Sequence, residues 1–386
     1  MRAEFQLSSN NDNYNDSAAS SPPARRINTN GISGDHAESF PAQQQSNKSV
    51  VLARLDDEIF DLDDVGFPPK PLTIEDPTCL KCNKADQNRK RKLIEVLRSE
   101  ERMKKRISMI KTKFKPKSAV TVMTVNTGQI HLFLNWVCSC ERHGIEVRDS
   151  TLMVPTDRNA ANIIERNNFT ILPLDWITEL GFTIDAKYEG ADQAGWNPHM
   201  QGHSDINSVT VIVANDLVQN DYTLLLHDVD IVWQIDPRDW LRDAAIQRDC
   251  LAMFAPRWDS LGVANSGFVW MVANKRTKIF MQTLENLLPV KGISDQQLWN
   301  ALLRHHKFRQ IGFRVLPLLQ FQLLYDHTLR KWNQIKDKAI VVHGVSHRKT
   351  YRLAKANLWF FDEKCSAYTK DLVPCGGDFM APSCKI

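Results

Sequence analysis

The stretch Leu224-Leu225-Leu226-His227-Asp228-Val229-Asp230-Ile231-Val232-Trp233 decides the fold of this chain. A leucine-rich run ends at two aspartates one residue apart, and β-branched residues and a tryptophan follow, which is typical of a buried strand that ends in acid. At the end of such a strand the backbone can turn so that Asp228 and Asp230 both reach one hard divalent cation, which takes oxygen ligands. The alternative is that both aspartates only cap and solvate a core strand.

Strand and helix patterns alternate along the chain before this stretch. A β-branched run over 119–125 ends in the turn Asn126-Thr127-Gly128, and apolar residues at helical spacing follow over 130–137. The same plan repeats with strands expected over 152–154 and 170–173. This alternation predicts a Rossmann-type α/β fold, with a mixed, mostly parallel sheet flanked by helices.

Polar side chains follow the ends of these expected strands. Asn126 and Thr127 follow the first, Asp157 follows the second, and Asp228 follows the leucine-rich run. Ligands of such sheets bind beyond the carboxyl ends of the strands, so these side chains are expected to border a ligand site. Ordinary turn chemistry is the alternative for Asn126-Thr127-Gly128.

Three further motifs lie in the second half of the chain. Asn265-Ser266-Gly267 precedes a strand expected over 268–272, where a small residue lets the backbone come close to a ligand. Asp295-Gln296 opens a helix, although an acid there also suits capping and the helix dipole. An apolar strand over 339–343 ends in His343, a candidate third ligand beside the two aspartates, although a hydrogen-bonded surface histidine is the commoner case.

Taken together, these motifs resemble the nucleotide-diphospho-sugar transferases with a GT-A-type fold. The resemblance covers approximately Ala119 to Leu358. It is carried by the Asp-x-Asp stretch with Asp236-Pro237 after it, and by Thr124-Val125-Asn126-Thr127-Gly128, Asn135-Trp136, Asn265-Ser266-Gly267-Phe268, Asp295-Gln296 and His343-Gly344 with Lys349 and Leu353. It implies a GT-A-like catalytic domain of the retaining type.

The resemblance also implies three sets of site residues. The metal ligands for Mn²⁺ (or Mg²⁺) are Asp228, Asp230 and His343. The catalytic set is Asp295 and Gln296, which face the sugar, and Lys349, which stabilises the leaving diphosphate. The donor-binding set is Thr124, Asn126, Thr127, Asp157, Asp228, Asn265, Ser266, Gly267 and Arg348.

One departure from the family pattern concerns the residues after His343. In related transferases a glycine and a lysine follow the histidine at tighter spacing, whereas here Gly344 is adjacent and Lys349 lies farther on. His347 is therefore an alternative for the histidine role, and Arg348 is an alternative for the phosphate role of Lys349.

The chemistry these residues suit is metal-dependent transfer of a sugar from a nucleotide-diphosphate donor to a hydroxyl of a glycan or glycoprotein, with retention as the resemblance implies. Two other classes stay open. A hydrolase of nucleotide sugars would deliver water through the same aspartates, and a non-catalytic adaptor would act through the N-terminal segments. A nucleic-acid partner is not expected, because the formal net charge of +4 is small and the basic segment lacks interleaved aromatic residues.

The 386 residues, 42% of them hydrophobic, suffice for one large or two modest folded domains. Residues 1–50 are polar and expected to be disordered, and 51–88 form an acidic, then cysteine-containing linker. Apolar residues at helical spacing within a Lys/Arg-rich segment predict one basic amphipathic helix over 89–117. The transferase domain is expected over 118–360, with a C-terminal tail over 361–386.

The basic helix is a candidate for peripheral contact with acidic lipid, although such a helix face is more often plain surface and can equally dock on the catalytic domain. The stretch 186–204 has neither a helical nor a strand period and is expected to be a long loop that acts as a lid or contacts the acceptor. His199 and His203 in this loop do not match a helical metal pair, because proline and glycine surround them.

The eight cysteines are too few and scattered for a disulfide-built scaffold. Cys79-x-x-Cys82 could be half of a zinc site, but the next pair, Cys138 and Cys140, lies in an apolar helical pattern, so ordinary thiols are expected. Cys365, Cys375 and Cys384 could form a disulfide in the tail if the compartment is oxidising. No apolar run reaches the roughly 18 residues of a membrane span, and no signal segment follows Met1. The resemblance implies the Golgi if the N-terminus is incomplete, and the cytosol otherwise.

Overall fold

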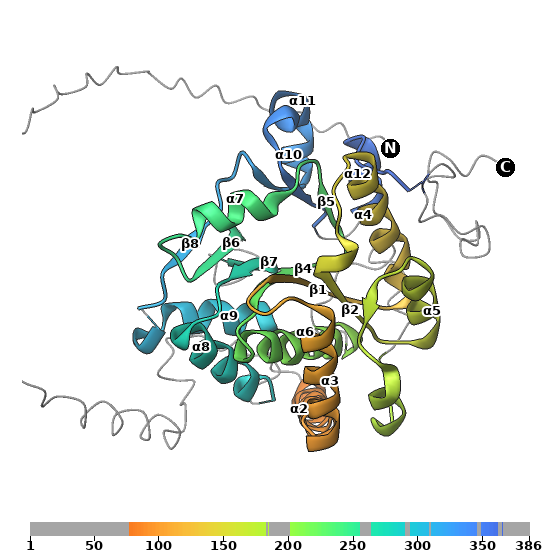
Figure 1. The fold of residues 1–386 in the computed structure, drawn as a ribbon, viewed down its shortest axis with the longest axis vertical. Coiled ribbons are helices and arrows are strands. Elements are labelled where there is room, and N and C mark those ends of the chain that lie inside the picture. Colours follow the sequence, from red (N-terminus) through yellow and green to blue (C-terminus); the bar gives the residue numbers. More distant parts are fainter. Residues whose placement is uncertain are drawn as a thin grey trace, which may run out of the picture. The chain divides into compact units, whose positions relative to one another are not determined.

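The structure of the chain is a computed structural model (Figure 1). It describes residues 77–182, 184, 201–254, 264–289, 294–308, 310–345, 349–361 and 365, with the backbone alone at 77–86, 201–204 and 306. The segment expected to be disordered, the acidic part of the linker, and the tail beyond Phe361 apart from Cys365 lie outside these residues.

A seven-stranded sheet forms the centre of the described unit, in the order β3-β2-β1-β4-β7-β6-β8. Neighbours are parallel from β3 through β2 and β1 to β4 and again at β6 with β8, and antiparallel on both sides of β7. The predicted mixed, mostly parallel α/β sheet is therefore confirmed. The strands are β1 (Ala119–Val125), β2 (Thr151–Pro155), β3 (Thr170–Ile171), β4 (Thr223–His227), β6 (Cys250–Phe254), β7 (Ala264–Met271) and β8 (Phe313–Val315).

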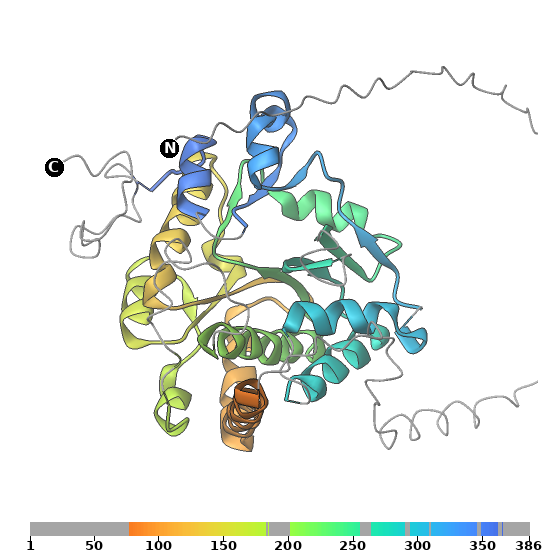
Figure 2. The same ribbon diagram turned by 180° about the vertical axis from the view of Figure 1, so that it is seen from behind.

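Helices cover both faces of this sheet, which explains why its central strands read as continuous apolar runs. In β1, Met123 and Val125 pack into the core with α4 and α5, while Val120 and Val122 pack into the core with α6, α8 and α9. Figures 1 and 2 show α4 and α6 on opposite sides of the strands. These helices are α4 (Ile130–Arg142), α5 (Arg158–Arg166), α6 (Gln201–Gln219), α8 (Lys275–Leu287) and α9 (Asp295–Arg304).

A smaller, three-stranded sheet adjoins the first where β4 ends. Its strands are β5 (Ile231–Trp233), β10 (Val341–His343) and β9 (Phe321–Leu323), with β10 in the middle, antiparallel to β5 and parallel to β9. The chain thus passes from one sheet to the other through Asp228 and Asp230. The neighbouring helices are α7 (Pro237–Ala244), α10 (Asp326–Arg330), α11 (Trp332–Ile335) and α12 (Lys349–Lys355), and the short 3₁₀ turns are η2 (Thr127–Gln129), η3 (Arg148–Ser150), η4 (Leu174–Glu179), η5 (His306–Phe308) and η6 (Lys336–Lys338).

Two helices take the place of the single basic helix expected over 89–117. They are α2 (Pro77–Leu97), which begins inside the expected linker, and α3 (Glu100–Lys113). The chain breaks between them at Arg98, whose side chain turns inward to Asp216 and Glu285. The end of the first helix thus coincides with these tertiary ion pairs, which the helical spacing of apolar residues does not reveal.

Buried charge joins these two helices to α6 and α8. Arg106, which is 3% exposed, donates to Asp216 at 2.5 Å and to the Leu97 carbonyl, and Arg98 bonds both Asp216 and Glu285. Burial disfavours the charged guanidinium, but the two acids outweigh that effect and raise the pKa of Arg98. Two cations thus face two anions, and the helices pack on α6 as part of one core.

The C-terminal part of the chain is fastened to α4. Asn135 on α4 donates to the Leu358 carbonyl at 3.2 Å and accepts from the backbone N–H groups of Phe360 and Phe361. A disulfide joins Cys138 on the same helix to Cys365, so the expectation that Cys138 is an ordinary thiol was wrong. The two cysteines are 227 positions apart in sequence, and spacing rules cannot identify such a pair.

Removing this disulfide is expected to lower the free energy of unfolding by about 2–5 kcal/mol, because the cross-link restricts the unfolded chain across a long loop. The measurement is urea unfolding of the double variant Cys138→Ser/Cys365→Ser against the wild-type protein under non-reducing conditions, which keep the wild-type disulfide intact. Cys140→Ala is the matched control, since Cys140 is a free, buried cysteine on the same helix. If the double variant unfolds like the control, the cross-link does not stabilise the fold.

None of the helices in the described residues has both the length and the apolar composition needed to cross a lipid bilayer.

Candidate active site

Three side chains converge where the two sheets meet. One ligand atom each from Asp228, Asp230 and His343 lies within 4.8 Å of the others. His343 Nε2 is 3.1 Å from Asp230 Oδ1 and 3.7 Å from Asp228 Oδ2. Lys349 on α12 closes the group, with its Nζ 2.5 Å from Asp230 Oδ2. We refer to Asp228, Asp230 and His343 as the acid–histidine cluster.

Backbone pairing fixes the cluster from three strands. The Asp228 N–H donates to the Gly267 carbonyl in β7 at 2.7 Å, and the Gly344 N–H donates to the Asp230 carbonyl at 2.8 Å. His343 ends β10, where it lies opposite Ile231 at the start of β5. The turn between β4 and β5 is therefore tied on both sides, which orients the two carboxylates toward the histidine.

Because Gly267 has no side chain, the side chains of the cluster can pack against its backbone. A Cβ atom added there would lie 2.3 Å from Asp228 Oδ2 and 2.8 Å from His343 Cε1. Real Cβ contacts do not come so close, so a side chain at this position would displace the ligand atoms. The glycine predicted from sequence as a point of close approach lies against the cluster itself, inside β7 rather than before it.

The protein shifts the pKa values of Asp228 and Asp230 in opposite directions. Burial disfavours the charged form of Asp230, but Lys349 and His343 outweigh it and lower the pKa of this carboxyl. For Asp228, desolvation by the surrounding protein and the negative charge of Asp230 raise the pKa to about 6, although 55% of its side chain is exposed. Asp295 adds to the same upward shift, so its carboxylate lies within electrostatic reach of Asp228.

The pKa values of the two histidines in this region, His343 and His227, shift in opposite directions. Burial lowers the pKa of His343, but the Asp230 carboxylate outweighs burial, so the net pKa is raised. For His227, burial and the nearby His343 lower the pKa to about 3, which keeps its ring neutral. His227 packs between Trp136 and Trp233, with ring centroids 5.3 and 5.4 Å away. It belongs to the aromatic core under the cluster rather than to the ligand set.

The donor set of the cluster suits a divalent metal ion. Two carboxylates supply hard oxygen ligands and an imidazole supplies nitrogen, the combination that Mn²⁺ accepts. His343 Nδ1 is buried and has no hydrogen-bond partner among the residues that the structure describes, and the absence of a side chain at Gly267 leaves space beside the ligand atoms. These residues could therefore hold the ion that the sequence predicted.

Four of the predicted donor-side residues lie at the carboxyl ends of β1 and β2. Asp157 caps α5 through the Ala160 N–H and accepts the Thr127 N–H at 2.7 Å. Asn126 is fully buried, and its Oδ1 accepts from the Gln129 N–H, while its Nδ2 has no partner within the described part of the chain. Thr124 is 8% exposed and its hydroxyl accepts from Thr210 on α6 at 2.6 Å. These four residues thus lie close together, and several of their polar groups already make hydrogen bonds within the protein.

The motifs on β7 and α9 are bonded to each other. Gln296 Oε1 accepts the Ser266 N–H at 3.0 Å, and Asn265 Oδ1 accepts the Gly267 N–H at 2.9 Å. Ser294, not Asp295, caps α9. Asp295 instead accepts the Asn207 side-chain amide at 2.7 Å. The capping alternative for Asp295 is therefore wrong, and its carboxylate is held from α6.

The family model described as nucleotide-diphospho-sugar transferase matches residues 152–355, more than half of the chain. This chain belongs to the nucleotide-diphospho-sugar transferase family. Its mixed, mostly parallel sheet with helices on both faces is the α/β fold that the sequence predicted. No curated protein matches its sequence.

Solved structures similar to this transferase are themselves glycosyltransferases. The bifunctional glycosyltransferase WbbM is 10% identical, over 62% of this chain and 49% of its own, with a TM-score of 0.40. The glycosyltransferase GlyE of Streptococcus pneumoniae TIGR4 is 14% identical, over 63% and 60%, with a TM-score of 0.42. Mouse xyloside xylosyltransferase 1 is 13% identical, over 59% and 97%, with a TM-score of 0.36. The transferase spans about half of the first of these proteins and three fifths of the second.

Two asparagines at the site were missed from the sequence of the transferase. Asn207 lies on α6 and bonds Asp295, and Asn300 on α9 bonds both backbone groups of Ala264 at the start of β7. The available signal was weak, since each asparagine is one of several polar residues in its helix. The predicted donor residue Arg348 and the alternative His347 lie outside the described residues, as does His199, and of His203 only the helical backbone in α6 is described.

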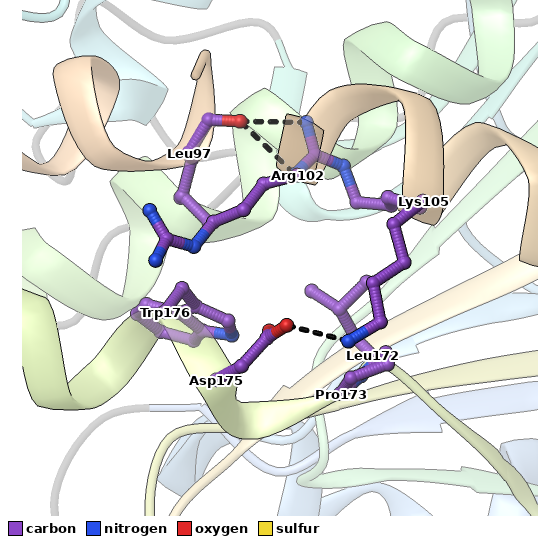
Figure 3. A pocket seen from close by; sticks show the side chains of 8 residues that line it. Leu97, Arg102, Lys105, Leu172, Pro173, Asp175 and Trp176 are labelled. Carbon is purple, nitrogen blue, oxygen red and sulfur yellow. Dashed lines mark hydrogen bonds and ion pairs between the residues drawn. The ribbon is translucent and has the colours of Figure 1, made fainter. Parts of the chain in front are cut away.

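A separate small pocket lies between α3 and η4 (Figure 3). Its walls include Leu97, Leu172 and Trp176, and Lys105 crosses it to bond Asp175 at 2.7 Å. The space has room for little more than one water molecule, so it cannot hold a sugar nucleotide. The acid–histidine cluster therefore stays the candidate active site of the transferase.

Proposed function

We propose that this glycosyltransferase moves a sugar from a nucleotide-diphosphate donor to a hydroxyl of a glycan or glycoprotein, that it needs a divalent metal, and that it retains the configuration at the anomeric carbon. The observation that carries the proposal is the convergence of Asp228, Asp230 and His343 within 4.8 Å, with Lys349 beside them. Family membership supports the nucleotide-sugar donor.

In this proposal Asp228, Asp230 and His343 hold Mn²⁺ or Mg²⁺, which when bound supplies positive charge for the leaving diphosphate. Lys349 is proposed to support the same step. Its ammonium group lies 2.5 Å from Asp230, and its positive charge would stabilise the negative charge that develops on the leaving diphosphate. Arg348, next in sequence, is proposed to bind the same phosphates.

The remaining donor contacts are assigned to the ends of the strands. Thr124, Asn126, Thr127 and Asp157 are proposed to border the nucleoside, with the partnerless Asn126 Nδ2 as a donor to the base or ribose. Asn265, Ser266 and Gly267 on β7 are proposed to line the sugar, since Gly267 lies against the cluster.

Asp295 and Gln296 are proposed to act at the sugar ring. Asp295 lies close enough to Asp228 to influence its ionisation, which supports a position beside the donor sugar. Gln296 accepts from Ser266 and so links α9 to the strand that carries Gly267. Retention of configuration is taken from the family, and no carboxylate is assigned as a covalent nucleophile.

We also propose that the protein works in an oxidising compartment such as the Golgi lumen. The disulfide between Cys138 and Cys365 supports this, because such bonds persist where thiols are not kept reduced. Contact with an acidic membrane surface is proposed for the exposed lysines at the end of α3 and after it, which are Lys111, Lys113, Lys115 and Lys117.

The deciding experiment is calorimetric titration of nucleoside diphosphates and nucleotide sugars with and without Mn²⁺. We expect one nucleotide to bind only with the metal, and Asp228→Ala and Asp230→Ala to weaken that binding at least about 100-fold, since each removes a ligand oxygen. Asp239→Ala is the control, because Asp239 is an exposed acid on α7. If no nucleotide binds with any metal, the proposed activity fails. If sugar is released equally without an acceptor, the enzyme is a hydrolase.

A further inference from the structure

The first half of α6 connects three parts of the protein that are far apart in sequence. Asn207 donates from its side-chain amide to Asp295 Oδ1 on α9 at 2.7 Å. One turn further along, the Thr210 hydroxyl donates to the Thr124 hydroxyl near the end of β1 at 2.6 Å. These side chains therefore fix α6 against two elements of the proposed site.

The same half of α6 is held from its other side by the N-terminal helix α2. Arg89 donates to Asp205 through Nε at 2.9 Å and through a second guanidinium nitrogen. The Asp205 side chain is fully buried, and the Arg89 guanidinium also lies 3.8 Å above the Phe182 ring. Both nitrogens donate to the same oxygen, Asp205 Oδ2, and these charge-assisted bonds fix the position of the buried carboxylate against α2.

We infer that Asn207 is a positioning residue for Asp295, and that helix α2 supports this arrangement through the Arg89–Asp205 pair. The inference rests on the proposed function, in which Asp295 acts at the sugar. One oxygen of Asp295, Oδ1, is taken by the Asn207 amide, which fixes the rotation of the carboxylate toward the sugar. The N-terminal helix thus contributes to catalysis without touching substrate.

The geometry distinguishes effects on catalysis from effects on binding. The cluster is held by β4, β7 and β10 and makes no bond to Asn207, so the affinity for metal and nucleotide should not depend on this amide. Misplacing a group that acts at the reacting carbon lowers the rate of the chemical step. Loss of Asn207 should therefore lower kcat while the donor KM stays nearly constant.

The test uses the full chain with Mn²⁺ and the nucleotide sugar that titration identifies. Asn207→Ala is expected to lower kcat about 10- to 100-fold with the donor KM within about twofold of wild type. Arg89→Ala is expected to lower kcat in the same direction. Asn220→Ala and Arg91→Ala are the matched controls, because Asn220 makes a similar amide bond at the far end of α6 and Arg91 is exposed on α2. Both controls should keep the wild-type kcat.

A double variant separates positioning from a general loss of structure. If Asn207 acts through Asp295, Asn207→Ala/Asp295→Ala has the same kcat as Asp295→Ala alone, because the single change already removes the group that is positioned. Multiplying losses in the double variant, or a wild-type kcat in Asn207→Ala, would overturn the inference. An inactive wild-type enzyme would instead overturn the proposed function, and the inference with it.

Discussion

Gly267→Ala is expected to abolish metal-dependent nucleotide binding. The added methyl group would lie 2.3 Å from Asp228 Oδ2 and 2.8 Å from His343 Cε1, so both side chains must shift. The Asp228 side chain is 55% exposed and can rotate outward, which relieves its own contact but removes a carboxylate from the cluster, and the buried His343 ring must also move. The protein should therefore fold while the cluster loses its geometry.

Two measurements check the Gly267 prediction: calorimetric titration of Mn²⁺ with the nucleotide, and thermal unfolding of the same sample. We expect the affinity to fall at least about 100-fold, comparable to removal of a ligand oxygen. Gly144→Ala is the control. Gly144 has a φ of +66° but open space around its Cβ position, so that variant should lose about 1–2 kcal/mol of stability and keep its binding. Wild-type affinity in Gly267→Ala would contradict the placement of the cluster.

The sheet and the position of Asp228 and Asp230 could be read from the sequence because both depend on local pattern. Strand-sized apolar runs that alternate with helical periods leave few arrangements other than a parallel sheet with helices on both faces. The carboxyl ends of parallel strands meet at one edge, so the residues after β1, β2 and β4 had to lie close together. Asp157 and Thr127, which are bonded to each other, are an example.

The boundaries of β7 show where local pattern misleads. The strand begins at Ala264, so Asn265-Ser266-Gly267 lies inside it and not in a turn before it. Asparagine and glycine are poor strand formers, and their local preference predicts a turn. Asn300 overrides that preference, because its side chain bonds both the N–H and the carbonyl of Ala264.

The contacts that sequence could not supply are those between distant segments. The Asn207–Asp295 bond joins residues 88 positions apart, and the Cys138–Cys365 disulfide joins residues 227 positions apart. Neither partner carries a local signal of the other, since each sits in an ordinary helical or tail pattern. The pairing of two such positions is set by the packed fold, which a single sequence does not display.

Asp216→Ala is expected to lower the free energy of unfolding by about 3–5 kcal/mol, the usual cost of leaving a buried charge without its partner. The carboxylate of Asp216 on α6 accepts hydrogen bonds from Arg98, between α2 and α3, and from Arg106 on α3. Arg98 keeps Glu285 in the variant, but Arg106, which is 3% exposed, keeps only the Leu97 carbonyl among the described residues. A carbonyl dipole cannot replace a carboxylate beside a buried guanidinium.

Urea unfolding of Asp216→Ala measures this effect, and Asp175→Ala is the matched control. Asp175 pairs with Lys105 on the same helix α3, but both side chains are about half exposed, so that loss should stay under about 1 kcal/mol. Similar values for the two variants would mean that the pairs with Arg98 and Arg106 are screened by water and that α2 and α3 dock weakly. A much larger loss for Asp216→Ala would show that α2 and α3 are firmly docked on α6. The proposed support of α6 by Arg89 on α2 requires such docking.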